Sequence, residues 1–304
     1  MTTISSTHIL SSHNVADPNP DRNLVTILNK YPLWIHQELL THRAFSRNTA
    51  SSRAIPIKRM IEAAQDDPAM PIHWYRNEPG MQGYQPMSKI EIDDARDIWL
   101  RARDSAVLHA LHMSDTNAHK QLVNRLLGPF IHTIACISAT EWSNFFGVRL
   151  HHSTEPHMRD LAQVILAAVE KNPVQQLQPQ QWHLPFIQGE DMEEAHKLYD
   201  NPEFGGSYED ILIPLSVARA ASTSYKTVDN LHMTSERANA LYSKLVAQVP
   251  LHASPAEHVA QADGCVDYYE QILKTHKKVW LHPQDHRNFV GFCQQRSMLK
   301  DDTL

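Results

Sequence analysis

The segment from Thr41 to Arg53 constrains the fold more than any other part of the chain. It reads THRAFSRNTASSR, so arginines, a histidine and short hydroxyl and amide side chains outnumber its apolar residues. Such a segment is a poor core element and a poor solvated helix, and we expect a loop. Guanidinium groups present a planar fork of donors, which suits a bound phosphate. On composition alone, a surface loop with scattered charge is the simpler interpretation.

Length and composition exclude several classes of protein. The chain has 304 residues and is 42% hydrophobic, enough for the core of one large domain or two small ones. Neither an apolar run of membrane-spanning length nor a basic-then-apolar start occurs, so we expect no transmembrane helix or signal peptide and a cytoplasmic protein. The net charge of -6 disfavours a general nucleic-acid binder, so an anionic ligand would need a local arginine cluster.

Cysteine, histidine and glycine usage bounds the chemistry. Cys136, Cys265 and Cys293 are far apart and show no CxxC spacing, so we expect no disulfide framework and assign no metal site. Cys136 lies among apolar residues and should be buried, which gives a cysteine nucleophile little support. Pairs such as His151 and His152 are more often surface residues than ligands. Neither GxGxxG nor a P-loop occurs, so a Rossmann domain is disfavoured.

Helical patterns dominate, with a few strand candidates, and we predict an α+β fold. Residues 1–20 are polar and should form a flexible N-terminal arm, followed by a single domain over 21–304 with a candidate internal boundary in the loop at 173–190. Leu33 to Leu40 should be extended. A capping box of Ser88 and Glu91 predicts a helix start. The other helices that we expect span 117–127, 139–150, 153–172 and 235–248.

The spacing His-Arg-x-x-Ser-x-Asn-x-x-Ser-x-Arg over 42–53 resembles the signature of the flavin-dependent thymidylate synthases. Asn144 and Arg149 are similar to a second motif of that family. There, an asparagine contacts the flavin, and an arginine five residues later contacts the pyrimidine and helps to ionise its ring nitrogen. Arg125, within Asn-Arg-Leu-Leu-Gly-Pro, resembles the family's nucleotide-holding arginine in Ala-Arg-x-x-x-Pro.

Two further resemblances lie downstream. Residues 217–225, VARAASTSY, resemble the family's Ala-Arg-x-Ser-Tyr, and 252–258, HASPAEH, resemble its His-x-Ser/Thr-Pro-x-Glu-His. Both precede the arginine-rich loop in the family and follow it here. A circular permutation explains this order, because the same contacts form whichever bond is cut. The resemblance thus implies a mixed sheet flanked by helices, with a circularly permuted motif order, and Arg296 could supply the arginine that Thr41 replaces.

The resemblance implies an enzyme that methylates C5 of a pyrimidine deoxynucleotide, most simply dUMP to dTMP. Methylenetetrahydrofolate would be the carbon donor, reduced FAD the hydride source and NADPH the reductant. Arg149 would be catalytic, since a permanently charged group beside the ring stabilises its deprotonated form. The implied substrate-binding residues are Glu38, Ser51, Ser52, Arg53, Arg125 and Arg149. The implied cofactor-binding residues are His42, Arg43, Ser46, Asn48, Ser138, Asn144, His252, Ser254 and Arg296.

The family builds its sites at subunit contacts of a homotetramer, and we expect a homotetramer that binds a small nucleotide but neither a nucleic-acid polymer nor a membrane. Several positions depart from the family pattern. Thr41 and Thr140 each stand where the family has an arginine. Thr49 replaces a glutamate of the family, and Ser138 replaces an asparagine.

Glu38 stands where the family has a glutamine that touches the nucleotide. A carboxylate accepts hydrogen bonds, which suits a cytosine amino group better than a uracil carbonyl, although Glu38 can instead pair with Arg43 or Arg53. Two alternatives therefore stay open. One is methylation or hydroxymethylation of dUMP or dCMP to make a modified nucleotide. The other is a non-catalytic relative that binds nucleotide or flavin.

Overall fold

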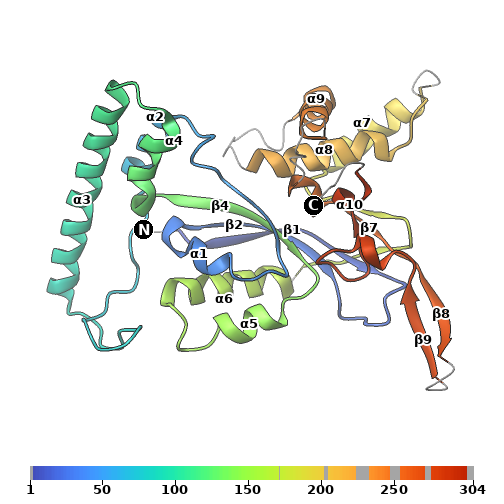
Figure 1. Cartoon of the computed structure of the whole chain (residues 1–304), viewed down its shortest axis with the longest axis horizontal. Helices are drawn as coiled ribbons and strands as arrows, with labels where there is room; N and C mark the ends of the chain where they lie inside the picture. Colours follow the sequence, from blue (N-terminus) through green and yellow to red (C-terminus); the bar gives the residue numbers. More distant parts are fainter. Residues whose placement is uncertain are drawn as a thin grey trace.

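The computed structural model of the chain describes residues 3–170, 172–201, 205–223, 233–246, 254–270 and 275–299 (Figure 1). No helix in these ranges is long and apolar enough to cross a membrane. The elements are, in chain order, β1 (Ser5–Asn14), β2 (Leu24–Pro32), η1 (Leu33–Ile35), α1 (His36–Leu39), β3 (Ser46–Thr49), α2 (Ile57–Asp66), α3 (Lys89–Asp115), α4 (Lys120–Val123), η2 (Asn124–Phe130), β4 (His132–Ala139), α5 (Ser143–Arg149), α6 (Pro156–Glu170), β5 (Gln175–Leu177), β6 (Trp182–His183), α7 (Gly189–Tyr199), α8 (Glu209–Ser222), α9 (Ser235–Val246), η5 (Ser254–His258), β7 (Ala260–Ala262), β8 (Cys265–Glu270), β9 (Thr275–Trp280), η6 (Pro283–Asp285), β10 (Phe292–Gln294) and α10 (Gln295–Met298).

A five-stranded sheet in the order β3-β4-β2-β1-β5 forms the centre of the molecule. Strands β1 and β5 are parallel and the other neighbours are antiparallel, so the sheet is mixed. A smaller antiparallel sheet has the order β10-β7-β6, and β8 pairs with β9 in a separate hairpin. Helices pack around this core, and the prediction of an α+β fold with a mixed sheet is confirmed.

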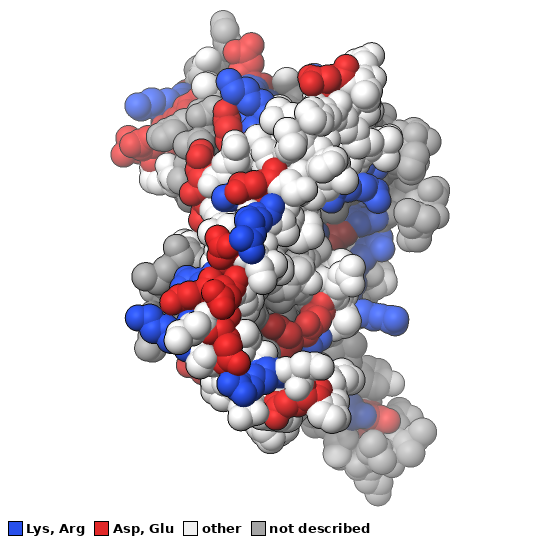
Figure 2. Space-filling view, turned by 90° about the vertical axis from the view of Figure 1, so that its left-hand side faces the viewer, with Lys and Arg blue, Asp and Glu red and all other residues white. Residues whose placement is uncertain are grey.

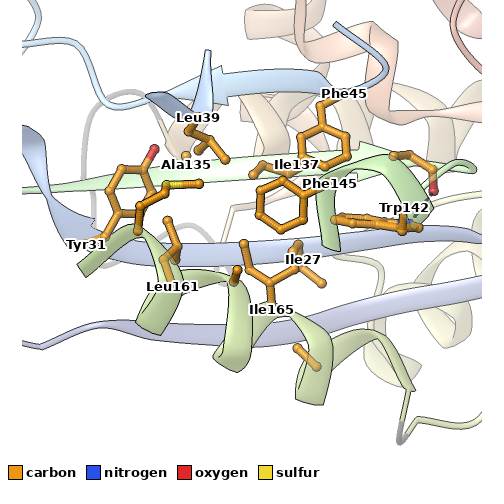
Figure 3. Packing of buried hydrophobic residues seen from close by; sticks show 14 of the residues in the cluster. Ile27, Tyr31, Leu39, Phe45, Ala135, Ile137, Trp142, Phe145, Leu161 and Ile165 are labelled. Atoms are coloured by element: carbon orange, nitrogen blue, oxygen red, sulfur yellow. Dashed lines mark hydrogen bonds between the residues drawn. The ribbon is translucent and has the colours of Figure 1, made fainter. Parts of the chain in front are cut away.

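The two faces of the central sheet are covered by different parts of the chain. Ile27 of β2 and Ile137 of β4 point to the face that packs against α5 and α6, where Phe145, Leu161 and Ile165 complete the largest apolar cluster (Figure 3). Alternation along a strand sends intervening residues to the opposite face, which α8 and η5 cover. Each fully buried side chain of this size stabilises the fold by about 1.5–3 kcal/mol.

The long helix α3 begins where the sequence predicts. The hydroxyl of Ser88 accepts from the amide of Glu91, whose carboxylate accepts from the amide of Ser88, which confirms the capping box. Trp99 packs α3 against the cluster beneath α2 and η2, and its indole donates to Ala69 O at 3.0 Å. The outward face of α3 is solvated, and on the side of the molecule seen in Figure 2 acidic and basic side chains are interspersed.

The expected flexible arm over 1–20 is wrong, because residues 5–14 form β1 inside the central sheet. The polar side chains of this segment led us to expect exposure to solvent, yet several of them form hydrogen bonds within the fold. Ser12 Oγ lies 2.6 Å from His183 Nδ1, and Asn14 Nδ2 donates to two main-chain carbonyls. Buried polar groups are tolerated when they are hydrogen-bonded in this way. Those partners lie more than 150 residues away in sequence, so the composition of the segment does not reveal them.

Other segments also depart from the predicted structure. Leu33 to Leu40 is helical rather than extended, because η1 and α1 follow β2 directly after Pro32. The helix expected over 117–127 is short, and a 3-10 helix that contains Pro129 continues it. The loop expected at 173–190 contributes β5 to the central sheet and β6 to the smaller one. It therefore connects the two sheets.

Candidate functional site

Arg149 lies at the end of α5 and joins the segment that carries α1 and the loop after it. Its Nε donates to His42 Nε2 at 2.9 Å, and its Nη1 donates to Glu38 Oε2 at 3.0 Å. Nη2 donates to both Glu38 O and Thr41 Oγ1 at 3.0 Å. Residues that are more than 100 positions apart thus meet around one guanidinium group. Every partner is an acceptor, which fixes the orientation of the planar fork.

Aromatic packing holds this cluster in place. The His42 ring lies 4.9 Å from the ring of Phe145 and 5.8 Å from that of Phe45. Phe145 is buried and precedes Arg149 by four residues on α5, so both side chains lie on one side of that helix. Arg47 closes the loop by donating from Nη1 to His42 O at 3.1 Å and Leu40 O at 2.8 Å. The position of Arg149 therefore depends on an apolar support.

Burial and neighbouring charges shift two pKa values in the cluster. Burial lowers the pKa of His42, and the positive charges of Arg149 and Arg47 lower it further. The neutral imidazole is the form that accepts at Nε2. Burial raises the pKa of Glu38; Arg149 opposes this rise, and Glu155 adds to it. The site therefore combines a permanent cation, a neutral imidazole and a carboxyl group with increased proton affinity.

A cavity of about 700 Å³ opens beside Arg149. This volume lies within the range of small-molecule sites. The residues that line it are Glu38, Met81, Gln82, Gly147, Val148, Arg149, His151, Ser153, Thr154 and Glu155. A second cavity, of about 510 Å³, lies between the start of α3 and the segment that follows α2, and its lining contains none of the predicted site residues.

Ser46 and Asn48, predicted as cofactor-binding residues, are buried in β3, so the loop expected over 41–53 is wrong for residues 46–49, which pair with β4 in the central sheet. Asn48 Nδ2 donates to Ala220 O at 2.6 Å and Thr223 Oγ1 at 3.0 Å, both from α8 or its C-cap. Ser46 Oγ accepts from Gln294 Nε2 at 3.1 Å. The arginine-rich segment and the motif at 217–225 thus meet in space, as far as the latter is described.

Ser138 is also buried. Its hydroxyl lies 2.8 Å from His258 Nδ1 and 2.6 Å from Thr26 Oγ1, which in turn lies 2.8 Å from His183 Nε2. His258 is the last residue of the HASPAEH motif, so this motif packs against β4. Ser254 is exposed at the start of η5, and His252 lies outside the described residues.

The predicted phosphate-holding residues form a second group. Arg53 and Arg125 are exposed, while Ser51 and Ser52 are partly exposed. Asn124, next to Arg125, donates from Nδ2 to Ser52 O at 2.7 Å and to Ile55 O at 2.9 Å. The two arginines therefore lie on adjoining segments. Among the described residues, no side-chain hydrogen bond or ion pair joins this group to the Arg149 cluster.

The remaining predicted cofactor residues differ in exposure. Arg43 and Asn144 are exposed. Arg296 forms an ion pair with Glu257 of η5, whose charge also acts on Arg47. Thr41 itself is bound by Arg149.

Sequence reasoning did not single out three side chains that organise this region. Arg47 donates to main-chain carbonyls of the preceding loop, such as Leu40 O. Glu155 lines the same cavity as Glu38. Arg219 of the 217–225 motif is 2% exposed, and it donates to both carboxylate oxygens of Asp191, at 2.5 and 2.8 Å. The small residues that surround Arg219 in the sequence were the available signal for its burial.

Comparison with known proteins finds no matching family model and no matching curated protein. Among solved structures, the chain is similar to the UMP/dUMP methylase PolB from Streptomyces cacaoi bound with 5-Br UMP, with a TM-score of 0.46 and 15% identity over 56% of this chain and 90% of that one. The complex of PolB with 5-Br dUMP gives a TM-score of 0.46 and 14% identity over 56% of this chain and 91% of that one. A likeness at this level does not define a family.

Proposed function

We propose that the protein is a flavin-dependent enzyme that methylates C5 of a pyrimidine deoxynucleotide, in the simplest case dUMP to dTMP. The observation that carries this proposal is the convergence of Glu38, Thr41 and His42 on Arg149, which with Glu38 lines a cavity of about 700 Å³. His42 and Arg149 belong to two motifs that resemble those of the flavin-dependent thymidylate synthases, and they are 107 positions apart in the sequence. A ligand site explains why they meet at a cavity.

The chain's own residues supply orientation and charge. Arg149 keeps its charge at any physiological pH, so its guanidinium beside a pyrimidine ring favours the ionised ring and makes C5 more nucleophilic. The acceptors that now bind Arg149 fix the orientation of its guanidinium group. On ligand binding, ligand atoms could replace Thr41 Oγ1 or Glu38 Oε2 as acceptors. Arg53, Arg125 and the two serines Ser51 and Ser52 offer donors for the nucleotide phosphate.

The residues present fit a flavin only in part within one chain. The exposed Arg43, Asn144 and Ser254 are free to contact a cofactor, whereas Ser46, Asn48 and Ser138 are engaged in internal hydrogen bonds. We assign a structural role to these three buried residues, which stabilise the strands next to the site, rather than direct contact with the cofactor. Bound FAD, once reduced by NADPH, would supply the hydride, and methylenetetrahydrofolate the carbon unit.

We also propose a homotetramer, which the family resemblance implies and the separation of two predicted groups of residues supports. The phosphate-holding group around Arg53 and the cluster around Arg149 are separate within the described part of one chain. Two subunits that face each other would bring one group of each kind together. We therefore place each complete site between subunits, as the family resemblance implies.

A second candidate function is methylation or hydroxymethylation of dCMP. It is favoured by Glu38, whose carboxylate Oε2 is bonded to Arg149 on the wall of the cavity. A carboxylate accepts from the amino group at C4 of cytosine, while uracil presents a carbonyl there.

The test is an assay dependent on NADPH and methylenetetrahydrofolate that offers dUMP and dCMP separately and measures the mass of the product. The purified protein should be yellow, and its product should be heavier than the substrate by one methyl or one hydroxymethyl substitution. Flavin binding without a product from either nucleotide would favour a non-catalytic relative. Absence of both flavin and product would overturn the enzyme proposal.

A further inference from the structure

The β8–β9 hairpin projects from the rest of the molecule (Figure 1). Most of its residues are exposed, including the large apolar side chains of Val266, Tyr268, Tyr269 and Val279. Two-stranded hairpins are marginally stable on their own, because each strand has a partner on one side only and little apolar surface is buried. The geometry of this hairpin must therefore be fixed at its base.

Asp263 lies at that base, two residues before β8 begins. Its side chain is 1% exposed and has contacts at both oxygens. Oδ1 accepts from the amide of Gly264 at 2.8 Å and lies 2.9 Å from His282 Nδ1. Oδ2 accepts from the amide of His282 at 2.9 Å and lies 2.9 Å from His286 Nε2. The carboxylate thus joins the two ends of the hairpin.

Cys293 of β10 completes a set of three different ligand types. One carboxylate oxygen of Asp263, one ring nitrogen of His282 and the sulfur of Cys293 all lie within 4.8 Å of one another. Ligand atoms around a tetrahedral zinc ion, at about 2.0–2.3 Å from the metal, are separated by about 3.3–3.8 Å. Movements of about 1 Å would bring the three atoms to this spacing.

We propose that Asp263, His282 and Cys293 bind a zinc ion that fixes the base of the hairpin. Carboxylate, imidazole and thiolate are the ligand types that zinc takes in proteins. The His282 side chain is 58% exposed, so solvent has access and a water molecule can complete the tetrahedron. On binding, the Cys293 thiol gives its proton to solvent, and His282 presents the lone pair of Nδ1 with its proton on Nε2.

His286 positions the carboxylate for this role. Its Nδ1 accepts from the amide of Gly291 at 3.2 Å, so its proton is on Nε2 and is donated to Asp263 Oδ2. This leaves Oδ1 directed toward His282. The ring of Trp280 packs on the His286 ring at 5.5 Å and limits its movement. Hydrogen-bonded neighbours of this kind orient ligands at metal sites.

Hydrogen bonds alone could also fix the base of the hairpin. Binding of Co²⁺ distinguishes a metal site from hydrogen bonds alone. The full-length protein is stripped with EDTA and titrated with Co²⁺, which reports thiolate ligation as a near-ultraviolet charge-transfer band. We expect one ion per chain, displaced by Zn²⁺, with at least a tenfold loss of affinity in Cys293→Ser and His282→Ala. Cys265→Ser and His276→Ala, which alter residues of the same hairpin outside the cluster, should bind as the wild type does.

Limited trypsin digestion gives a second readout on the unaltered protein. Lys277 and Lys278 are exposed on β9, and Zn²⁺ should slow cleavage there relative to the stripped protein. A stripped protein that binds neither Co²⁺ nor Zn²⁺ at micromolar concentration would overturn the proposal. So would a charge-transfer band that persists in Cys293→Ser. Neither measurement depends on the proposed enzymatic activity.

Discussion

At the scale of single residues, Arg149 is the side chain on which the proposed chemistry depends. Replacing it with Ala removes the only charge assigned to stabilising the ionised ring, and we expect turnover to fall by about 10²–10³-fold. Arg149→Lys should also be impaired, because an ammonium group cannot reproduce the planar fork. The measurement is kcat under saturating substrates, with circular dichroism to check the fold.

The matched control for Arg149 is Arg101→Ala. Arg101 also lies on a helix, where it pairs with Asp97 at 2.8 Å, but this pair is exposed on α3. Its removal should leave kcat unchanged. Full activity in Arg149→Ala would remove Arg149 from the catalytic site.

Glu38 is the residue at which we expect the choice of base to be decided. In Glu38→Gln, the amide can donate to a uracil carbonyl, which the ionised carboxylate cannot do. We expect the ratio of kcat/KM for dUMP over dCMP to rise by about tenfold, which corresponds to about 1.4 kcal/mol. Glu62→Gln, a change on the exposed face of α2, is the control. An unchanged ratio in Glu38→Gln would show that Glu38 holds Arg149 without reading the base.

At the scale of secondary-structure elements, the start of α3 offers a direct measure of local stabilisation. Ser88→Ala removes one half of the capping box and should lower the free energy of unfolding by about 1 kcal/mol. Ser105→Ala, in the exposed middle of the same helix, should leave stability equal or slightly higher, because Ala is the better helix former. Urea denaturation at pH 7 measures both. Equal effects would contradict a specific role of the cap.

The buried pair of Arg219 and Asp191 joins α8 to the first turn of α7. Arg219→Ala should lower the free energy of unfolding by about 3–5 kcal/mol, because Asp191 is left as an unpaired buried charge. Removing the exposed Arg101–Asp97 pair should cost less than about 1 kcal/mol. A loss in Arg219→Ala as small as that of the exposed pair would show that water reaches Asp191.

At the scale of the whole molecule, features set by neighbours in sequence were predictable and features set by distant contacts were not. The start of α3 follows from Ser88 and Glu91 alone. The strand β1 did not follow, since burial of Ser12 depends on His183 from β6. Periodicity of the sequence did not place His42 beside Arg149 either; only the family resemblance pointed to a common site.

The cluster of Asp263, His282 and Cys293 is a second feature that could not be predicted from neighbours in sequence. Its residues have no regular spacing, because a hairpin and a turn separate them in the chain, and for this reason no metal was predicted from their pattern. Their proximity arises from the pairing of β8 with β9 and of β7 with β10. The first pairing is a local hairpin, whereas the second joins strands about thirty residues apart and depends on the whole fold.

Two buried histidines make the stability of the fold sensitive to acid. Burial, with smaller contributions from His258 and His8, lowers the pKa of His183 to about 3, and burial lowers that of His258 to about 3. Both are therefore neutral in the native protein. In the unfolded chain, their pKa returns to about 6.5. Below that pH the unfolded state binds protons that the native state does not, so stability falls as the pH falls from about 6.5 toward 3.

The predicted loss between pH 7 and pH 5 is about 4 kcal/mol for the two histidines together, and little change is expected above pH 7. Urea denaturation at pH 8, 7, 6 and 5 measures it. His183→Gln and His258→Gln should each remove about half of this pH dependence, whatever they do to stability at pH 7. The exposed His109→Gln should leave the curve unchanged. The contrary result is a free energy of unfolding that stays constant from pH 7 to pH 5. It would mean that both histidines accept protons in the folded protein. The buried hydrogen-bond network that contains them would then have to open to water; its members are Ser12, His183, Thr26, Ser138 and His258.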